Sequence, residues 1–324
     1  MSGGVFLLLD ENTRKHCLPV LLKTSPELKK AKIIQIASGE KNKTIESCNH
    51  IWAELTKSNA DRNSLLINLG GGVICDIGGF CASVYKRGIK HINIPTTLLS
   101  MVDAAWGGKT GIDFQDIKNL IGTFKKPDVV FVEPKFLKTL PDRQILSGMA
   151  EVAKHALIAD KKYWKLLKEE NFTLKRSGEK IINKSIEIKT NITRKDPLEK
   201  SQRKILNFGH TIGHAIESYS NKYDKDPILH GEAIAAGMIC EALLSSIVAG
   251  LPQKDLNEII YWISAVFPPV KLNEEAIPEI MKFMTNDKKN KEGKINFTLL
   301  KRIGKAEIDY ECDVKLIEKA LKTY

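Results

Sequence analysis

The 324-residue sequence lacks several features that would assign it to a specialised class of protein. No apolar run reaches the length of a membrane-spanning helix. The short apolar stretch near the N-terminus is not preceded by a basic region, so it does not resemble a signal peptide. The six cysteines form no CxxC pair, and a disulfide framework is not expected in a chain of this size. We therefore expect a cytoplasmic protein with buried free thiols.

The positive charge is not gathered in one place. Lysine and arginine outnumber aspartate and glutamate by 50 to 39, giving a net charge of +11, but the lysines are dispersed along the chain. A nucleic-acid-binding protein usually concentrates such charge in one arm or stripe, so we expect neither nucleic-acid nor membrane binding. The charge indicates either an ordinary basic surface or a field that attracts an anionic substrate. Composition alone leaves both open.

The sequence changes its pattern near residue 145. Before it, short runs rich in isoleucine and leucine alternate with helical patterns, which is typical of a parallel sheet. After it, amphipathic helices dominate, with one predicted hairpin near the end. We predict an α/β fold with an N-terminal, Rossmann-like parallel α/β domain (1–145) and a mostly α-helical domain (146–324), a size that fits two domains. The clearest predicted strands are residues 31–38, 64–72, 91–97 and 128–134, and the predicted hairpin is 295–308.

Two glycine-rich segments in the first part are candidate binding sites. Gly70, Gly71 and Gly72 follow a predicted strand and precede a helical pattern, an arrangement that lets backbone N–H groups approach a phosphate. A tight turn with no ligand explains these glycines equally well. The segment 102–122 holds charged and amide side chains among glycines that disfavour a helix, so we expect either a binding loop or a flexible one.

Three of the seven histidines lie close together in the second part. His210 and His214 are four residues apart, so on a helix they share one face, and His230 opens the next helical pattern. Glu151 lies in an earlier helical segment. Two imidazoles and a carboxylate form a ligand set that suits zinc with positions left open for substrate. Any one of these histidines alone is more often an ordinary core or surface residue.

Beyond these local patterns, long strings resemble one enzyme family, 3-dehydroquinate synthase. They occur in the family's order, and they include LGGGVICDIGGFCASVYKRG (69–88), IPTTLLSMVDAAWGGKTGI (94–112), RKILNFGHTIGHAIES (203–218) and HGEAIAAGM (230–238). The family belongs to the sugar-phosphate cyclases, in a superfamily that also includes polyol dehydrogenases such as glycerol dehydrogenase.

The resemblance implies a carbon–oxygen lyase of the shikimate pathway, which leads to the aromatic amino acids. Such an enzyme converts the anionic seven-carbon sugar phosphate 3-deoxy-D-arabino-heptulosonate 7-phosphate to 3-dehydroquinate and phosphate. It does so by transient oxidation with NAD, phosphate elimination, reduction and an intramolecular aldol closure. The implied cofactors are NAD and one divalent metal, zinc or cobalt. The first domain would bind NAD, the second would bind metal and substrate, and the protein would be a homodimer.

The resemblance also implies a role for each matching position. The implied metal ligands are Glu151, His210 and His230. The implied NAD contacts are Glu40, Lys43, Gly71, Gly72, Val73, Asp76, Thr96, Thr97, Asp103, Lys109, Lys118, Phe136 and Thr139. Glu199 and His214 match the acid–base positions, and the other implied substrate contacts are Lys154, Lys189, Arg203, Asn207, Lys109 and Asn119. Lys288 (or Lys289) and Arg87 match phosphate contacts, Arg87 from the other subunit.

Three other functions share much of this pattern. A sister cyclase would act on a different sugar phosphate with the same cofactors. A polyol dehydrogenase would have no use for phosphate-binding lysines. A non-catalytic NAD or anion sensor would not need the metal and acid–base positions.

Two residues depart from the family pattern: Trp106, which either covers the nicotinamide pocket or packs outward, and Asp113, where asparagine is commoner.

Overall fold

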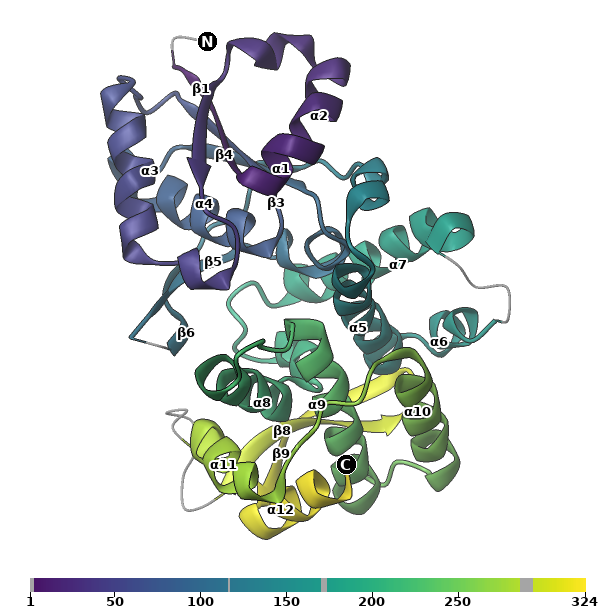
Figure 1. Ribbon diagram of the computed structural model, residues 1–324. Coiled ribbons are helices and arrows are strands. Elements are labelled where there is room, and N and C mark those ends of the chain that lie inside the picture. The colour runs from purple at the N-terminus through teal and green to yellow at the C-terminus, as the bar shows by residue number, and fades with distance from the viewer. Residues whose placement is uncertain (1–2, 116, 170–173, 286–293) are drawn as a thin grey trace. The chain divides into compact units, whose positions relative to one another are not determined.

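The structure is a computed structural model that describes residues 3–115, 117–169, 174–285 and 294–324. The chain divides into two units, Met1–Pro141 and Asp142–Tyr324 (Figure 1). The division falls just before helix α5 (Asp142–Ala159), slightly earlier than the change of pattern in the sequence suggests. A boundary after residue 145 would cut through the first turn of that helix.

The first unit is built on a five-stranded parallel sheet in the order β2-β1-β3-β4-β7. Phe6, Leu7, Leu8 and Leu9 of β1, which lies between β2 and β3, are all buried, as expected where helices cover both faces of a parallel sheet. The strands are β1 (Val5–Asp10), β2 (Lys32–Ile36), β3 (Leu65–Gly70), β4 (Lys90–Pro95) and β7 (Val129–Val130). The predicted α/β fold class is confirmed, and the four strands predicted most clearly are β2, β3, β4 and β7.

Helices and short turns connect these strands. Ile51 and Leu55 of α3 and Ile77 and Phe80 of α4 pack into the same core cluster as Leu8 of the sheet. The helices are α1 (Glu11–His16), α2 (Leu18–Thr24), α3 (Ile45–Lys57) and α4 (Gly72–Val84). Shorter 3₁₀ turns cover Pro26–Lys30, Glu40–Asn42, Tyr85–Arg87 and Pro134–Thr139, and a π-helical turn covers Ser100–Ala104.

Most of the glycine-rich segment 102–122, predicted as a loop, forms an antiparallel hairpin that is separate from the parallel sheet. Its strands are β5 (Lys109–Phe114) and β6 (Ile117–Phe124). Gly107 and Gly108 have φ angles of +85° and +72°, which glycine adopts without strain, and they turn the chain into β5. Ile112 is fully buried in the core cluster that contains α4. The prediction of a loop was wrong, because the burial of residues 110–112 holds β5 against the core although the frequent glycines indicated irregular structure.

The second unit is mostly helical, with one hairpin. Its helices are α5 (Asp142–Ala159), α6 (Lys161–Leu167), α7 (Leu174–Lys195), α8 (His210–Tyr223), α9 (His230–Leu244), α10 (Gln253–Val266), α11 (Ile277–Thr285) and α12 (Val314–Thr323). The hairpin pairs β8 (Lys294–Arg302) with β9 (Lys305–Asp313), close to the predicted range. Gln202–Asn207 and Glu274–Ala276 are 3₁₀ turns, and Ser245–Ala249 extends α9 as a π-helical turn.

Helix α9 is the central helix of this unit. Nearly all of its residues are buried, including apolar residues on every side of the helix. By length and composition the stretch His230–Ala249 could cross a membrane, but 78% of its apolar window is buried within the structure. Burial of this degree is typical of a core helix.

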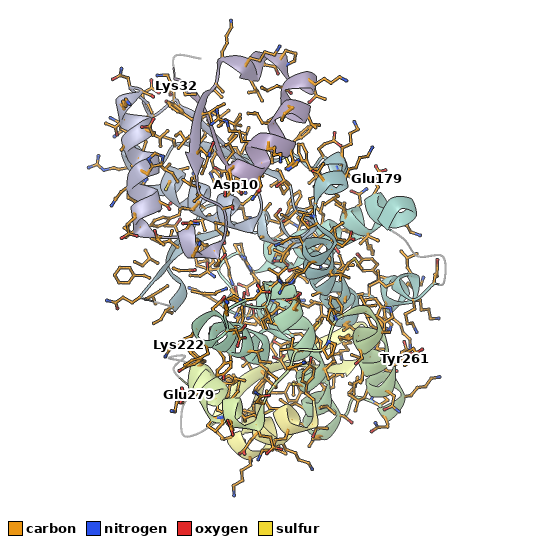
Figure 2. All side chains as sticks on the ribbon, in the orientation of Figure 1. Asp10, Lys32, Glu179, Lys222, Tyr261 and Glu279 are labelled. Atoms are coloured by element: carbon orange, nitrogen blue, oxygen red, sulfur yellow. The ribbon has the colours of Figure 1, made fainter. Side chains whose placement is uncertain are left out.

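The charged surface is spread over both units. Lys32 in the first unit and Lys222 in the second are exposed, and both extend outward in Figure 2, as does the exposed Tyr261 of α10. Neighbouring acidic groups pair with many of the lysines, for example Glu318 with Lys322 and Asp309 with Lys204. The described residues therefore show scattered positive charge rather than one basic stripe.

Candidate active site

The first unit carries a glycine turn at the carboxyl end of its sheet. Gly70 ends β3, Gly71 precedes α4, and Gly72 is the first residue of that helix. A Cβ atom at Gly71 would lie 3.0 Å from Cγ2 of Thr97, so a side chain there would fill the space beside the turn. The N-terminus of α4 has no side-chain cap. Uncapped N–H groups at the positive end of a helix dipole suit a phosphate group.

A buried lysine lies next to this turn. Lys43 is 3% exposed, and its Nζ donates to Oδ2 of Asp76 at 2.7 Å and to Oδ1 of Asn119 at 2.6 Å. Oε1 of Glu40 lies 3.7 Å from Nζ of Lys43 and 3.8 Å from Nζ of Lys118. The structure thus brings together five of the residues implied to bind NAD or substrate, from segments far apart in the chain.

Burial and charge act in opposite directions on this group. Burial alone would lower the pKa of Lys43, but the carboxylates of Asp76 and Glu40 raise it above its ordinary value. Burial raises the pKa of Asp76, and Lys43 opposes that shift. Lys43 therefore stays positively charged at neutral pH and holds Asp76 and Asn119 in fixed positions.

The two residues that depart from the family pattern have definite places. Oδ1 of Asp113 accepts the backbone N–H of Asn119 at 2.8 Å, and the backbone N–H of Asp113 donates to the carbonyl of Lys43 at 2.9 Å. Asp113 therefore supports Asn119, whose φ of +52° is unusual for a residue other than glycine. The indole N–H of Trp106 donates to the carbonyl of Met101 at 2.8 Å, so this ring is fixed to its own loop.

Phe136, Thr139 and Arg87, which were also predicted to contact NAD or phosphate, lie in two short 3₁₀ turns. Phe136 is buried in the 3₁₀ turn Pro134–Thr139, where the hydroxyl of Thr139 donates to its carbonyl at 3.4 Å. Arg87 is exposed in the turn beyond the C-terminus of α4, whereas the glycine turn precedes the N-terminus. A helix of this length separates the two by roughly 20 Å. Arg87 therefore does not join the Lys43 group.

In the second unit, α9 packs against both α5 and α8 (Figure 1). These three helices bring a carboxylate and three imidazoles together. Oε1 of Glu151 lies 3.4 Å from Nε2 of His210 and 3.4 Å from Nε2 of His230. The ring centroids of His210 and His214 are 5.0 Å apart, and those of His214 and His230 are 5.7 Å apart. The three predicted ligands therefore converge, with His214 beside them.

Each of the two predicted histidine ligands has a second partner. Nδ1 of His210 lies 3.1 Å from the carbonyl of Phe208, and Nδ1 of His230 lies 3.2 Å from Oε2 of Glu217. A proton on Nδ1 satisfies these acceptors, so Nε2, which lies beside Glu151, is the nitrogen that would bind a metal ion. This is the arrangement found around imidazoles that bind metal ions. The donor set fits a divalent metal such as zinc or cobalt.

Close contact between α8 and α9 explains why these side chains meet. A Cβ atom at Gly237 would lie 2.1 Å from the carbonyl oxygen of Gly209, and one at Gly213 would lie 3.0 Å from that of Ala233. Any larger residue at Gly237 would push the helices apart. The glycines thus allow the two backbones to touch, and the start of each helix carries one histidine ligand.

The electrostatics of this cluster favour a charged carboxylate. Burial would raise the pKa of Glu151, but Lys154, with which it forms an ion pair, and His210 hold that pKa well below its usual range. Burial also lowers the pKa of His210. It opposes charge on His230 too, but Glu217 and Glu151 raise the pKa of His230 to about 10. A bound metal would take the place of the proton on this imidazole.

A third group of predicted residues lies on the segment between α7 and α8. The amide of Asn207 donates to Oε1 of Glu199 at 3.0 Å, and Nε of Arg203 lies 3.8 Å from Oε2 of Glu199. The guanidinium of Arg203 is buried and donates to the carbonyl of Pro197 at 2.7 Å. Asp196 fixes this segment by accepting the backbone N–H groups of Lys200, Ser201 and Arg203.

Three further lysines were predicted as substrate or phosphate contacts in this unit. Lys189 is buried on α7, while Lys288 and Lys289 lie outside the described residues.

Two carboxyl groups of this unit were not predicted from the sequence: Glu217 and Glu241. Glu217 lies seven residues after His210 and three after His214, a helical spacing that could have identified it. Glu241 lies within an apolar stretch, and burial raises its pKa to about 8, although N–H groups of Ile212 and Gly209 favour its ionised form.

Solved structures with this fold include enzymes of two kinds. A 2-deoxy-scyllo-inosose synthase complexed with carbaglucose-6-phosphate, NAD+ and Co2+ has a TM-score of 0.85 and 25% identity, and the match covers 99% of this chain and 90% of that one. Glycerol dehydrogenase from Schizosaccharomyces pombe shares the fold at a TM-score of 0.63 and 14% identity, covering 100% of this chain and 83% of its own. The fold and the clustered site residues place the chain in the class that includes the sugar-phosphate cyclases.

Sequence comparison defines the family within that class. Residues 33–147 match the 3-dehydroquinate synthase N-terminal family and residues 148–290 match the 3-dehydroquinate synthase C-terminal family. The 3-dehydroquinate synthase of Parabacteroides distasonis is 43% identical over 322 residues, covering 99% of this chain and 91% of that protein. That of Clostridium tetani is 40% identical over 290 residues, covering 88% and 76%. The chain belongs to the 3-dehydroquinate synthase family, as the sequence motifs predicted.

Proposed function

We propose that this protein converts 3-deoxy-D-arabino-heptulosonate 7-phosphate to 3-dehydroquinate and phosphate. The observation that carries the proposal is the convergence of Glu151, His210 and His230 on three helices of a chain that belongs to this family. The nearby buried cations and the Glu199–Asn207 pair supply the further groups that such a reaction requires.

Glu151, His210 and His230 are the proposed ligands of one divalent metal, zinc or cobalt. Their Nε2 and Oε1 atoms already face one another, and the Nδ1 atoms are engaged elsewhere. The related inosose synthase was solved with Co2+, which supports this choice. When bound, the metal would polarise the substrate hydroxyl that is oxidised and lower its pKa. Lys154 keeps Glu151 ionised, as a ligand must be.

The first unit is the proposed binding site for NAD, which supplies a reversible hydride acceptor. The glycine turn at the start of α4 would bind the pyrophosphate, since a side chain at Gly71 would fill the space beside it. Lys43 forms ion pairs with Glu40 and with Asp76 of α4, and Glu40 and Lys43 are assigned to the adenosine side. The other proposed contacts are Val73, Asp76, Thr96, Thr97, Asp103, Lys109, Lys118, Phe136 and Thr139.

The proposed substrate contacts in the second unit are cationic. Lys154, Lys189 and Arg203 are all buried, and a substrate that carries carboxylate and phosphate groups would gain charge-assisted hydrogen bonds from them. Asn207 orients the carboxyl group of Glu199 through its hydrogen bond to Oε1. We assign proton transfer to that carboxyl group and to the imidazole of His214. Lys109 and Asn119 of the first unit, together with Lys288, are also proposed as substrate contacts.

A homodimer in the cytoplasm is also proposed. The hairpin β5–β6 exposes Ile117, Leu120 and Phe124, whose side chains are 54%, 49% and 54% exposed, and a second subunit would bury such apolar groups. Arg87, separated from its own glycine turn by the length of α4, would serve the other subunit. All six cysteines are free and buried, which fits a reducing compartment.

The decisive experiment measures phosphate release from the seven-carbon substrate with NAD and metal present. We expect many phosphates per NAD and no accumulation of NADH, because the hydride is returned in each cycle. Phosphate release from a different sugar phosphate alone would identify a sister cyclase. Stoichiometric NADH from glycerol, without phosphate release, would identify a polyol dehydrogenase. His230→Ala should lose the metal; full metal occupancy in that variant would refute the ligand assignment.

A further inference from the structure

Glu241 is a carboxyl group on the buried core helix α9. It is 0% exposed and lies on α9 among buried residues such as Met238 and Cys240. Its side chain reaches across to the start of α8. Oε2 accepts the backbone N–H of Gly209 at 2.6 Å, and Oε1 accepts that of Ile212 at 3.1 Å. Burial of a carboxyl group is unfavourable unless such bonds compensate for lost hydration.

The start of α8 depends on these two bonds. The first N–H groups of any helix have no partner within the helix, and a side chain at the N-cap position usually satisfies one of them. Here the N-cap is Gly209, which has no side chain, and its φ of +79° is one that other residues adopt only with strain. Glu241 therefore supplies from α9 the cap that α8 cannot supply for itself, and it lies at the positive end of the helix dipole.

The capped turn is the one that carries a proposed metal ligand. His210 is the first residue of α8, and its Nδ1 lies 3.1 Å from the carbonyl of Phe208, the residue just before Gly209. His230 is the first residue of α9, the helix that carries Glu241. One side chain thus joins the turn that holds one histidine ligand to the helix that holds the other.

We propose that Glu241 is a positioning residue for the metal site: by capping α8 from α9 it fixes the imidazole of His210 relative to that of His230. This inference rests on the metal site proposed above. Without the cap, the N–H groups of Gly209 and Ile212 would lose their acceptor, the first turn of α8 would loosen, and His210 would no longer be held in ligand geometry.

The test compares metal binding by wild-type protein, Glu241→Gln and Ser245→Ala. An amide has a single acceptor oxygen, and its NH₂ group would face a backbone N–H. We therefore expect Glu241→Gln to bind Zn2+ about 10–100-fold more weakly in chelator competition, the range typical for partners of metal ligands. The visible absorption spectrum of bound Co2+ should also change, since it reports ligand geometry.

Ser245→Ala is the matched control on the same segment. The hydroxyl of Ser245 is buried, donates to the carbonyl of Glu241 at 2.6 Å and accepts the N–H of Leu300 at 2.9 Å. Its loss removes buried hydrogen bonds without touching α8, so stability should fall while Zn2+ affinity stays unchanged. If Glu241→Gln is not recovered folded, Glu241→Asp, which is one methylene shorter, takes its place.

The outcomes separate the two proposals. A wild-type protein that binds no Zn2+ or Co2+ would refute the proposed metal site itself. Wild-type binding with equal affinity and an unchanged Co2+ spectrum in the Glu241 variant would refute the positioning role alone. If neither Glu241 variant folds while Ser245→Ala does, Glu241 serves the stability of the core, and the positioning role is likewise refuted.

Discussion

His91 should make the stability of the first unit depend on pH. It lies in β4 and is 0% exposed, and among the described residues neither ring nitrogen has a hydrogen-bond partner. Burial lowers the pKa of His91 from 6.5 to about 4; Asp128 opposes that shift and Lys125 adds to it. Oδ2 of Asp128 accepts a hydrogen bond from the backbone N–H of His91 at 3.1 Å. The folded protein therefore keeps this imidazole neutral.

The size of the effect follows from the two pKa values. In the unfolded chain the imidazole takes up a proton as the pH falls below 6.5, whereas in the folded protein it does so only near pH 4. The shifted pKa of His91 therefore costs no folding stability above pH 6.5, and the free energy of unfolding decreases as the pH falls from 6.5 toward 4. Each pKa unit corresponds to about 1.4 kcal/mol. We expect a loss of about 1.4 kcal/mol between pH 7.5 and pH 5.5, approaching about 3 kcal/mol near pH 4.

The variant His91→Leu removes the part of the pH dependence of stability that comes from this imidazole. Because the ring makes no hydrogen bond to a described residue, an apolar side chain of similar size should leave the fold intact. Urea unfolding followed by circular dichroism at pH 7.5 and 5.5 gives the difference in unfolding free energy between wild type and variant. That difference should shift by about 1.4 kcal/mol in favour of the variant at the lower pH. His50→Gln, which replaces an exposed histidine of the same unit, is the control. Parallel pH curves for wild type and His91→Leu would refute the reasoning.

Three further predictions concern the proposed site. Glu217→Gln removes the charge beside Nδ1 of His230 and should weaken Zn2+ binding about 10–100-fold in chelator competition; unchanged affinity would exclude Glu217 from the site. Lys43→Met leaves Asp76 without its cation and should lower the urea stability of the first unit by about 3 kcal/mol and weaken NAD binding in fluorescence titration. The more exposed Lys118→Met is its control, and an equal loss of stability in both would contradict the role of burial. Arg203→Ala should reduce the rate of phosphate release more than tenfold, since charge-assisted hydrogen bonds contribute about 1.5–3 kcal/mol, with an unchanged circular dichroism spectrum; wild-type turnover would show that Arg203 does not bind substrate.

The parts of the fold that the sequence predicted are those with a strong local signal. Buried strands such as β3 appear as continuous apolar runs, because a parallel sheet is covered on both faces. The hairpin β5–β6 was predicted as a loop because its outward residues are apolar and its glycines are frequent, so no alternation was visible. The burial of Ile112 in the core cluster that contains α4 is a long-range contact that no local pattern reveals.

For the site, local spacing predicted some groups and missed others. His210 and His214 were visible as a helical pair, and their convergence with His230 and Glu151 is present in the structure. The backbone contacts of Glu241 were not visible, because a carboxyl group within an apolar run gives no indication of which distant N–H group it accepts. Asp113 shows the same limit, since its bond to the backbone of Asn119 depends on the hairpin that was not predicted.

The crossing of α8 and α9 has a consequence for how this protein could vary. At Gly237 the two main chains already touch, so their separation cannot decrease, and only a larger residue at the crossing can increase it. The spacing of the two imidazoles therefore does not depend on how well the surrounding side chains fill the interior. Changes such as Ile280→Val or Met284→Leu should alter stability without altering ligand spacing. A single added methyl group at Gly237 would clash with the main chain of α8, so it should change the distance between the two imidazoles as well as the stability.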